Sequence, residues 1–280
     1  MAIRIITDST SDIPIENQAS LGIDIVPLSV IFEGEKYTDG IELKKEQFYK
    51  MLSSSTTLPT TSQVNPDEFE ALFKSYIDAG DTVVGIFISS KLSGTYQSAV
   101  IAKEALGSDQ IFIIDSKSAT FGLALLVYEA IKMRDNNADS EQIYAAINAL
   151  SNCVKFYAVV NTLKYLKMGG RLSSSAAILG GVLHIKPLVS IVDGEVKSVA
   201  KERGQKAAFA WILDKLKKDA PDTKYPFVVG HSNDPGVMQE FITYITGAVS
   251  TATPIICEIG CVIGTHSGPG CVGLAYIPQC

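Results

Sequence analysis

The stretch VVGIFISSKLSGTYQSA, residues Val83–Ala99, joins an apolar run directly to a group of hydroxyl-bearing side chains. Its first part, Val83–Ile88, is rich in β-branched and aromatic residues and therefore predicts a buried strand. The polar residues that follow lead into a helix that we expect to begin near Ser93. A strand that runs through a short loop into a helix is typical of α/β proteins with a parallel sheet.

Other segments of the N-terminal half repeat this pattern and are bounded by Ser, Asp, Gly or Pro. They predict strands at Ile3–Thr7, Ile23–Val30 and Ile111–Asp115. One helix between them has a clear amino end, because Asn65 is followed by Pro66 and then by Glu68 at the capping-box position. Its apolar residues recur at the spacing of one buried helix face: Phe69, Leu72, Phe73, Tyr76 and Ile77.

The pattern changes beyond about residue 160. Two alternating runs, Ile185–Asp193 and Val196–Lys201, flank Gly194 and predict antiparallel strands joined by a tight turn. Helices are then expected at Gly204–Lys217 and at Pro235–Ala248, the second capped by Asp234.

The length of 280 residues exceeds the usual size of one hydrophobic core and suits two modest domains. We therefore expect an α/β fold with a parallel-sheet domain at residues 1–160 and a mixed α/β domain at residues 161–280. Two such domains imply a crevice between them.

Charge and composition exclude several classes of protein. The chain is globular in composition, with 46% hydrophobic and 19% charged residues, and its net charge of -6 argues against nucleic acid or anionic membrane as a partner. No apolar run approaches the length of about 18 residues that a membrane span needs. Polar residues also follow Met1 too soon for a secretory signal, so we expect a cytoplasmic protein without stable membrane insertion.

The cysteines are odd in number and scattered, at Cys153, Cys257, Cys261, Cys271 and Cys280. We expect buried thiols rather than a disulfide framework. Cys257 and Cys261 are four positions apart, but no histidine lies at a zinc-finger spacing from them. The sequence therefore predicts neither a metal nor a cofactor.

Ser93 and Thr95 lie where a strand's carboxyl end meets a helix. Ligands bind at such places in open α/β sheets, and the unpaired amides of a helix start favour a carboxylate or phosphate. A serine there also serves as a helix cap. The cluster Thr60, Thr61 and Ser62 has the same two interpretations, because hydroxyls in a short loop often satisfy their own backbone.

His266 lies in the segment IGTHSGPGCVG, Ile263–Gly273, among glycines that let the backbone approach a ligand closely. We expect a glycine-rich loop here. Three of its glycines match G-x-G-x-x-G, but a dinucleotide site also needs a following helix and a distant acidic residue, and only seven residues remain. We therefore reject that interpretation.

Two further groups of charged residues are less specific. Asp8 and Asp115 each end a predicted strand, where we expect turns and caps, with orientation of a hydroxyl or histidine as the alternative. Lys164, Lys167 and Arg171 gather near the expected domain junction and are candidates for docking an anion or a partner.

Taken in order, these motifs resemble the DegV family across nearly the whole chain. The N-terminal half contributes DSTSD at Asp8–Asp12, TTSQ at Thr60–Gln63 and KLSGTYQSA at Lys91–Ala99. The C-terminal half contributes LKYLKMGGR at Leu163–Arg171, IKP at Ile185–Pro187, GHS at Gly230–Ser232 and GTHSGPG at Gly264–Gly270.

The resemblance implies a two-domain protein that binds a long-chain fatty acid in a buried pocket between its domains. Such proteins serve in many bacteria as the FakB-type subunit that presents the fatty acid to a separate fatty acid kinase, so this chain would not itself be an enzyme. By resemblance, Thr61, Ser93 and His266 grip the carboxylate. Arg171 matches a basic position on the headgroup or kinase side, and the remaining implied ligand-binding residues are Ser62, Gly94, Thr95 and Thr265.

The chemistry of a buried carboxylate agrees with this implication. Such a group needs several donors, which hydroxyls, helix amides and an imidazolium provide, and a neutral His266 still donates one bond. Burial of each methylene contributes about 0.8 kcal/mol, so the tail drives affinity. Two alternatives stay open: a carrier of another apolar acid or phospholipid, and a lipid hydrolase with Ser93 as nucleophile and His266 as base. Ser93 does not, however, lie in a G-x-S-x-G elbow.

Overall fold

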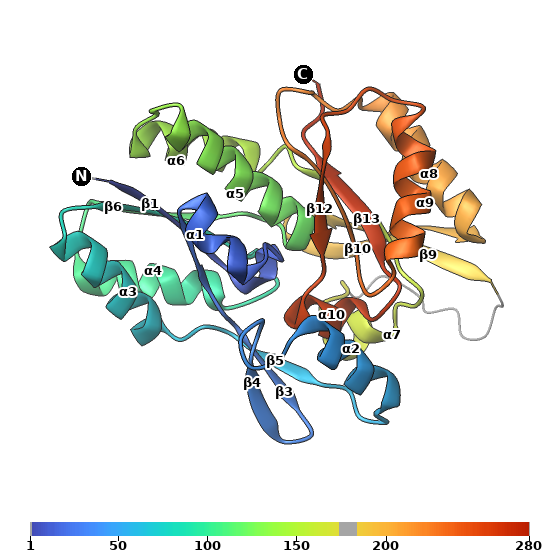
Figure 1. The fold of residues 1–280 in the computed structure, drawn as a ribbon, viewed down its shortest axis with the longest axis horizontal. Helices are drawn as coiled ribbons and strands as arrows, with labels where there is room; N and C mark the ends of the chain where they lie inside the picture. The colour runs from blue at the N-terminus through green and yellow to red at the C-terminus, as the bar shows by residue number, and fades with distance from the viewer. Residues whose placement is uncertain (1, 174–183, 280) are drawn as a thin grey trace.

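The computed structural model describes residues 2–173 and 184–279 and contains two large sheets and one small sheet (Figure 1). The first large sheet has four parallel strands in the order β2 (Ile23–Val26), β1 (Ile3–Asp8), β6 (Thr82–Phe87) and β7 (Ile111–Asp115). Successive residues point to opposite faces, so Ile6 and Phe87 pack against α3 (Pro66–Asp78) and α4 (Thr95–Leu106). Ile5 and Ile86 face the opposite layer.

That opposite layer contains α5 (Thr120–Asp135) and α6 (Ser140–Leu150). Helix α5 is buried along most of its length, because it packs against both large sheets. Its core residues include Phe121, Leu125 and Ala130, which share one hydrophobic cluster with Val84 of β6 and Ala275 of β13 (Val272–Tyr276). A helix that is apolar on all sides is expected where it is enclosed by protein.

The second large sheet has six strands and is mixed. Its order is β10 (Glu195–Arg203), β9 (Ile185–Val192), β8 (Lys155–Val159), β13, β11 (Phe227–His231) and β12 (Pro254–Glu258), and only β11 and β12 run parallel to each other among these pairs. Helices α8 (Gln205–Lys218) and α9 (Pro235–Thr246) cover the face opposite α5 through Phe209 and Phe241.

The small sheet pairs β4 (Glu35–Thr38), β3 (Ser29–Phe32) and β5 (Thr60–Ser62) in antiparallel fashion. The helices α2 (Lys45–Ser54), α7 (Lys164–Met168) and α10 (Cys261–Ser267) lie near it, below the six-stranded sheet in Figure 1. Two short 3-10 turns, Ser9–Ser11 and Ile15–Asn17, and α1 (Gln18–Leu21) connect β1 to β2. In the described ranges, no helix is long and apolar enough to cross a membrane.

Most of the local predictions are confirmed. The amide of Asn65 donates to Glu68 Oε1 at the start of α3, and Asp234 Oδ1 accepts from the Val237 amide at 3.0 Å at the start of α9. The hairpin of β9 and β10 turns at Asp193 and Gly194, which have φ values of 53° and 81°. Positive φ at both central residues is what a two-residue turn of this hand requires.

Two of the predictions were wrong. Ile23–Val30 is not one strand but two strands in different sheets, because Pro27 lacks the amide that a continuous ladder needs. The glycine-rich segment around His266 is partly helical, since α10 runs through Gly264 and His266 to Ser267. The expected division into domains at residue 160 stays a prediction, and β8, which precedes it, pairs within the six-stranded sheet.

Candidate functional site

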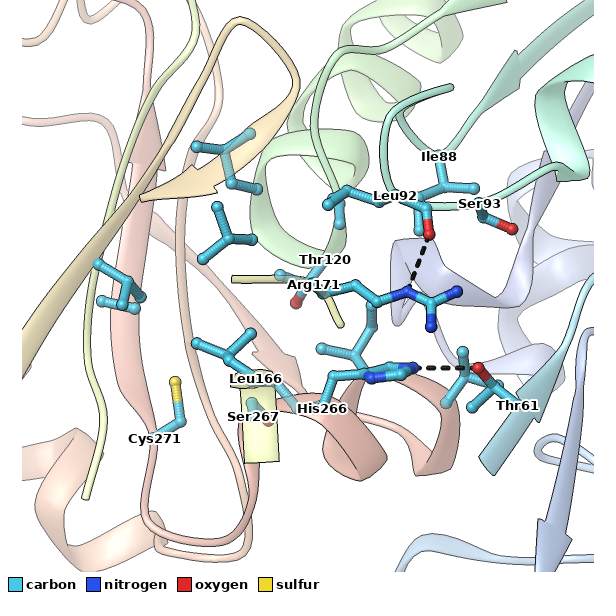
Figure 2. A pocket seen from close by; sticks show the side chains of 18 of the residues that line it. Thr61, Ile88, Leu92, Ser93, Thr120, Leu166, Arg171, His266, Ser267 and Cys271 are labelled. Carbon is cyan, nitrogen blue, oxygen red and sulfur yellow. Dashed lines mark hydrogen bonds between the residues drawn. The ribbon is translucent and has the colours of Figure 1, made fainter. Parts of the chain in front are cut away.

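A mostly apolar cavity lies where the loop after β6, the amino end of α5, the strands β8 to β10 and helix α10 meet. Its apolar lining comes from many elements and includes Leu28, Ile88, Leu92, Phe156, Val160, Leu166, Val189, Ile191, Val196, Val262 and Ile263. Its polar lining is short by comparison: Thr61, Gln63, Ser93, Thr120, Arg171, His266 and Ser267. Figure 2 shows Thr61, Ser93, Arg171 and His266 gathered on one side and Cys271 on the other.

Thr61 and His266 form the central contact of the polar end. Thr61 Oγ1 lies 3.0 Å from His266 Nε2, which joins strand β5 to the last turn of α10. Burial first, and then the charge of Arg171, lower the pKa of His266 to about 4. The imidazole is therefore neutral near pH 7 in the ligand-free protein, and not an imidazolium.

Ser93 lies in the turn before α4, whose N-cap residue is Gly94 rather than Ser93. Its Oγ lies 2.9 Å from Thr95 Oγ1 and accepts from the Thr95 amide at 3.2 Å, close to the helix start. It also lines the cavity. Gly94 allows a close approach here, because a Cβ on it would lie 2.0 Å from Gln63 Oε1.

Arg171 follows α7 and is held by backbone carbonyls. Its Nε donates to the Leu92 carbonyl at 3.1 Å and its Nη1 donates to the Gly169 carbonyl at 2.7 Å. Within the described part of the chain, no Asp or Glu forms an ion pair with this guanidinium. Its positive charge is therefore available to an anion at the polar end of the cavity.

Three of the predicted site residues do not line the cavity. Ser62 follows Thr61 on β5, so its side chain points to the other face of the strand. The Thr95 hydroxyl is hydrogen-bonded to the Ser93 hydroxyl, and Thr265 Oγ1 donates to the Cys261 carbonyl inside α10 at 2.9 Å. The predicted residues that do line it are Thr61, Ser93, Gly94, Arg171 and His266.

Three polar lining residues, Gln63, Thr120 and Ser267, were not predicted from the sequence. Gln63 lines the cavity and its Nε2 donates to Ser98 Oγ at 3.0 Å. Its place in the TTSQ motif could have identified it from the sequence. Thr120 begins α5 with a φ of 45°, which is rare for a β-branched residue. No sequence pattern predicts a positive φ at this threonine.

Asp8 and Asp115 serve turns, as expected. Asp8 Oδ2 accepts from the Ile88 amide at 2.8 Å and Oδ1 accepts from the Thr10 amide at 2.9 Å, and burial raises the Asp8 pKa to about 6. Asp115 accepts from the hydroxyl and amide of Ser90. Neither carboxylate contacts Ser93 or His266 through a hydrogen bond.

The cysteines in the described ranges carry free thiols. Cys257, Cys261 and Cys271 are buried and Cys153 is half-buried, while Cys280 lies outside the described residues. Burial raises the pKa of Cys271, which lines the cavity, to about 12. In the same ranges, no three His, Cys, Asp or Glu side chains are grouped so as to hold a metal ion.

The fold and the cavity together define an α/β protein whose two large sheets adjoin an internal apolar space with one polar end. A family model described as "Uncharacterised protein, DegV family" matches residues 2–279. The chain belongs to the DegV family, as its motifs predicted.

Individual relatives match this chain over nearly its whole length and theirs. A DegV domain-containing protein of Caldanaerobacter subterraneus is 38% identical over 275 residues, which is 98% of each chain. A solved structure described as fatty acid binding of a DegV family protein from Thermus thermophilus is 28% identical, with a TM-score of 0.90 and complete coverage of both chains. A stearic acid-binding protein from Eubacterium ventriosum is 29% identical, with a TM-score of 0.86 and coverage of 99% and 98%.

Proposed function

We propose that this protein binds a long-chain fatty acid in the cavity and holds its carboxylate with Thr61, Ser93 and His266. The observation that carries the proposal is the arrangement of the lining, in which two hydroxyls and an imidazole meet at one end of an otherwise apolar space. The carboxylate would lie at this end, beside the positive charge of Arg171, and the acyl chain would lie among the apolar residues. The fatty acids named for the related structures support this assignment.

Donors and acceptors at the polar end suit an anion. A neutral His266 that carries its proton on Nε2 donates to Thr61 Oγ1, which leaves the Thr61 hydroxyl proton free for the carboxylate. Ser93 accepts from the Thr95 amide, and its own hydroxyl proton is available to the carboxylate when the Thr95 hydroxyl is the donor in the hydrogen bond between the two hydroxyls. Each such hydrogen bond to a charged group contributes about 1.5–3 kcal/mol, which offsets part of the cost of removing the carboxylate from water.

Native mass spectrometry of the purified protein tests the binding. We expect a co-purified fatty acid, or stoichiometric uptake after incubation with stearic acid. Ser93→Ala should release the ligand at lower collision energy than the wild type, and Ser90→Ala, on the exposed side of the same loop, serves as the control. Empty protein even after incubation would contradict the proposal.

We further propose that the bound fatty acid is presented to a separate kinase, which is supported by the resemblance of the motifs alone. With such a kinase, Ser93→Ala and His266→Ala should slow acyl-phosphate formation much more than they lower the melting temperature. Equal losses of rate and of stability would instead indicate a structural role for both residues.

The hydrolase alternative has less support. Among the described residues, His266 pairs with Thr61 and Ser93 pairs with Thr95, so the Ser–His hydrogen bond of a triad is not formed. Asp8 is likewise committed to Thr10 and Ile88. Labelling by a serine-directed acyl-phosphonate that disappears in Ser93→Ala would instead indicate that Ser93 is a nucleophile.

A further inference from the structure

Two buried aspartates hold the amino end of α10, the helix that carries His266. Asp12 follows the 3-10 turn Ser9–Ser11 and accepts from the Gly260 amide at 2.8 Å. Asp39 follows β4 and accepts from the Cys261 amide at 3.2 Å. The first amides of a helix have no partner within the helix, so these two carboxylates supply acceptors that the helix lacks. Only 4% of Asp12 and 3% of Asp39 is exposed.

The carboxyl end of α10 is held by Ser232, which is the last residue of the GHS motif and directly follows β11. Its Oγ donates to the Gly268 carbonyl at 2.7 Å and accepts from the Cys271 amide at 2.8 Å. Its carbonyl also accepts from the Gly270 amide at 2.8 Å. The residues immediately after the helix are therefore tied to the six-stranded sheet.

Between these attachments, α10 has only seven residues. A helix of this length has little stability of its own in water, so its position depends on the groups that hold its ends. His266 lies in its last turn and meets Thr61 on a different element. A small rotation or shift of α10 would break that contact, because a hydrogen bond needs both a short distance and a favourable angle.

Burial of the two aspartates costs free energy, because their carboxylates lose contact with water. Burial raises the pKa of Asp12 to about 7 and also raises the pKa of Asp39. A carboxylate is disfavoured in a buried place unless its hydrogen bonds compensate, and packing alone would be better served by apolar side chains. What both have in common is an acceptor oxygen directed at the first amides of α10.

We propose that Asp12 and Asp39 are positioning residues, which fix helix α10 so that His266 meets Thr61 at the polar end of the cavity. This inference rests on the proposed function, since it assigns both aspartates to the fatty-acid site although neither lines the cavity. It also gives the DSTSD motif, which contains Asp12, a role in ligand binding at a distance.

The test compares Asp39→Ala, which removes the acceptor, with Asp39→Asn, which keeps an acceptor oxygen. Asp78→Ala, at the exposed end of α3, is the matched control for loss of an aspartate. The first readout is the ring ¹⁵N spectrum of His266 in ligand-free protein, assigned by its absence in His266→Asn. The second readout is the dissociation constant for stearic acid.

We expect Asp39→Ala to shift the His266 ring signals toward those of Thr61→Val and to weaken fatty-acid binding about tenfold. Asp39→Asn should keep the wild-type signals and bind within about threefold of the wild type, because it retains the hydrogen-bond acceptor. Wild-type His266 signals in folded Asp39→Ala would overturn the proposal. So would equal changes of the His266 signals and of the affinity in Asp39→Ala and Asp39→Asn.

If Asp39→Ala does not fold, Asp12→Gly and Asp12→Asn provide the same comparison. Asp12 has a φ of 57°, a conformation that glycine and asparagine both accept, so backbone strain does not confuse the result. We expect shifted His266 signals and weaker binding in Asp12→Gly, and near wild-type signals and binding in Asp12→Asn. Failure of the wild type to bind fatty acid would contradict the proposed function alone, because the His266 spectrum of the ligand-free protein still reports the position of α10.

Discussion

Thr61 Oγ1 and His266 Nε2 lie 3.0 Å apart although the two residues are 205 positions apart in the chain. Strand β5 brings Thr61 to this place, and α10 brings His266 from the other end of the sequence. The contact lies at the polar end of a cavity that is otherwise mostly apolar.

Replacing Thr61 by valine removes the hydroxyl while keeping the shape of the side chain. We expect Thr61→Val to weaken fatty-acid binding about tenfold, since it removes one donor to the carboxylate and the partner of His266. Displacement of a fluorescent fatty acid measures the effect. Thr60→Val is the control, because Thr60 is exposed on the same strand, and equal affinities of the two variants would contradict the prediction.

Gly169 provides the space for the His266 ring. Its backbone angles are ordinary, with φ of -74° and ψ of -5°, but a Cβ on it would lie 2.2 Å from His266 Nδ1. Gly169→Ala should therefore displace the ring, weaken fatty-acid binding and lower the free energy of unfolding by about 1–3 kcal/mol.

Gly247 is the matched control for this change. It ends α9 with φ of -75° and ψ of -8°, and a Cβ there would meet only the Thr243 carbonyl, at 3.8 Å. Gly247→Ala should be tolerated in both denaturant unfolding and fatty-acid binding. If Gly169→Ala were equally mild, His266 would not be packed against Gly169 in solution.

The stability of the protein should depend on pH through Asp12. Burial raises the Asp12 pKa to about 7 from its ordinary value of 3.8, so the folded state binds this proton more tightly than the unfolded state. The resulting contribution to stability is complete below about pH 4 and is lost as the pH rises through about 7.

Asp12→Asn removes that titration. Relative to this variant, the free energy of unfolding of the wild type should fall between about pH 4 and pH 7, by up to about 1.4 kcal/mol per pH unit. Urea unfolding across this range measures the difference. Asp78→Asn should follow the wild-type profile, and parallel profiles for wild type and Asp12→Asn would show that Asp12 does not titrate as described.

His266 should remain neutral well below pH 6 in the ligand-free protein, because its pKa is lowered to about 4. An NMR titration of its ring measures this value directly. Since burial is the larger cause and Arg171 the smaller, Arg171→Gln should raise the His266 pKa only in part. Lys164→Gln is the control on the neighbouring helix, and a bound fatty acid should raise the pKa in the wild type.

Local features of the fold could be predicted from the sequence because their causes are local. Asn65, Pro66 and Glu68 mark the start of α3 wherever that helix lies, and Asp193 with Gly194 forms a tight turn by its own backbone preferences. The strand predicted over Ile23–Val30 failed for a local reason as well, since Pro27 interrupts it.

His266 shows where the sequence pattern misled. The glycines around it indicated a loop, yet Gly264 lies within α10, where a Cβ would come 2.7 Å from Tyr49 Oη and 2.8 Å from a ring carbon of Phe48. Glycine is present there because α2 packs closely against α10, not because the backbone needs an unusual conformation. Side-chain contact between distant segments leaves no periodic signal along the chain.

The sequence by itself determined the family, the α/β class and the short list of polar residues from which the site is built. That information lies in the motifs and in their order along the chain. Only the tertiary structure decided that Thr61 and His266 touch, that Ser62, Thr95 and Thr265 do not line the cavity, and that Asp12 and Asp39 hold α10. Those facts depend on which face of a strand or helix is turned toward a partner far away in the chain, and packing of the whole core sets that orientation.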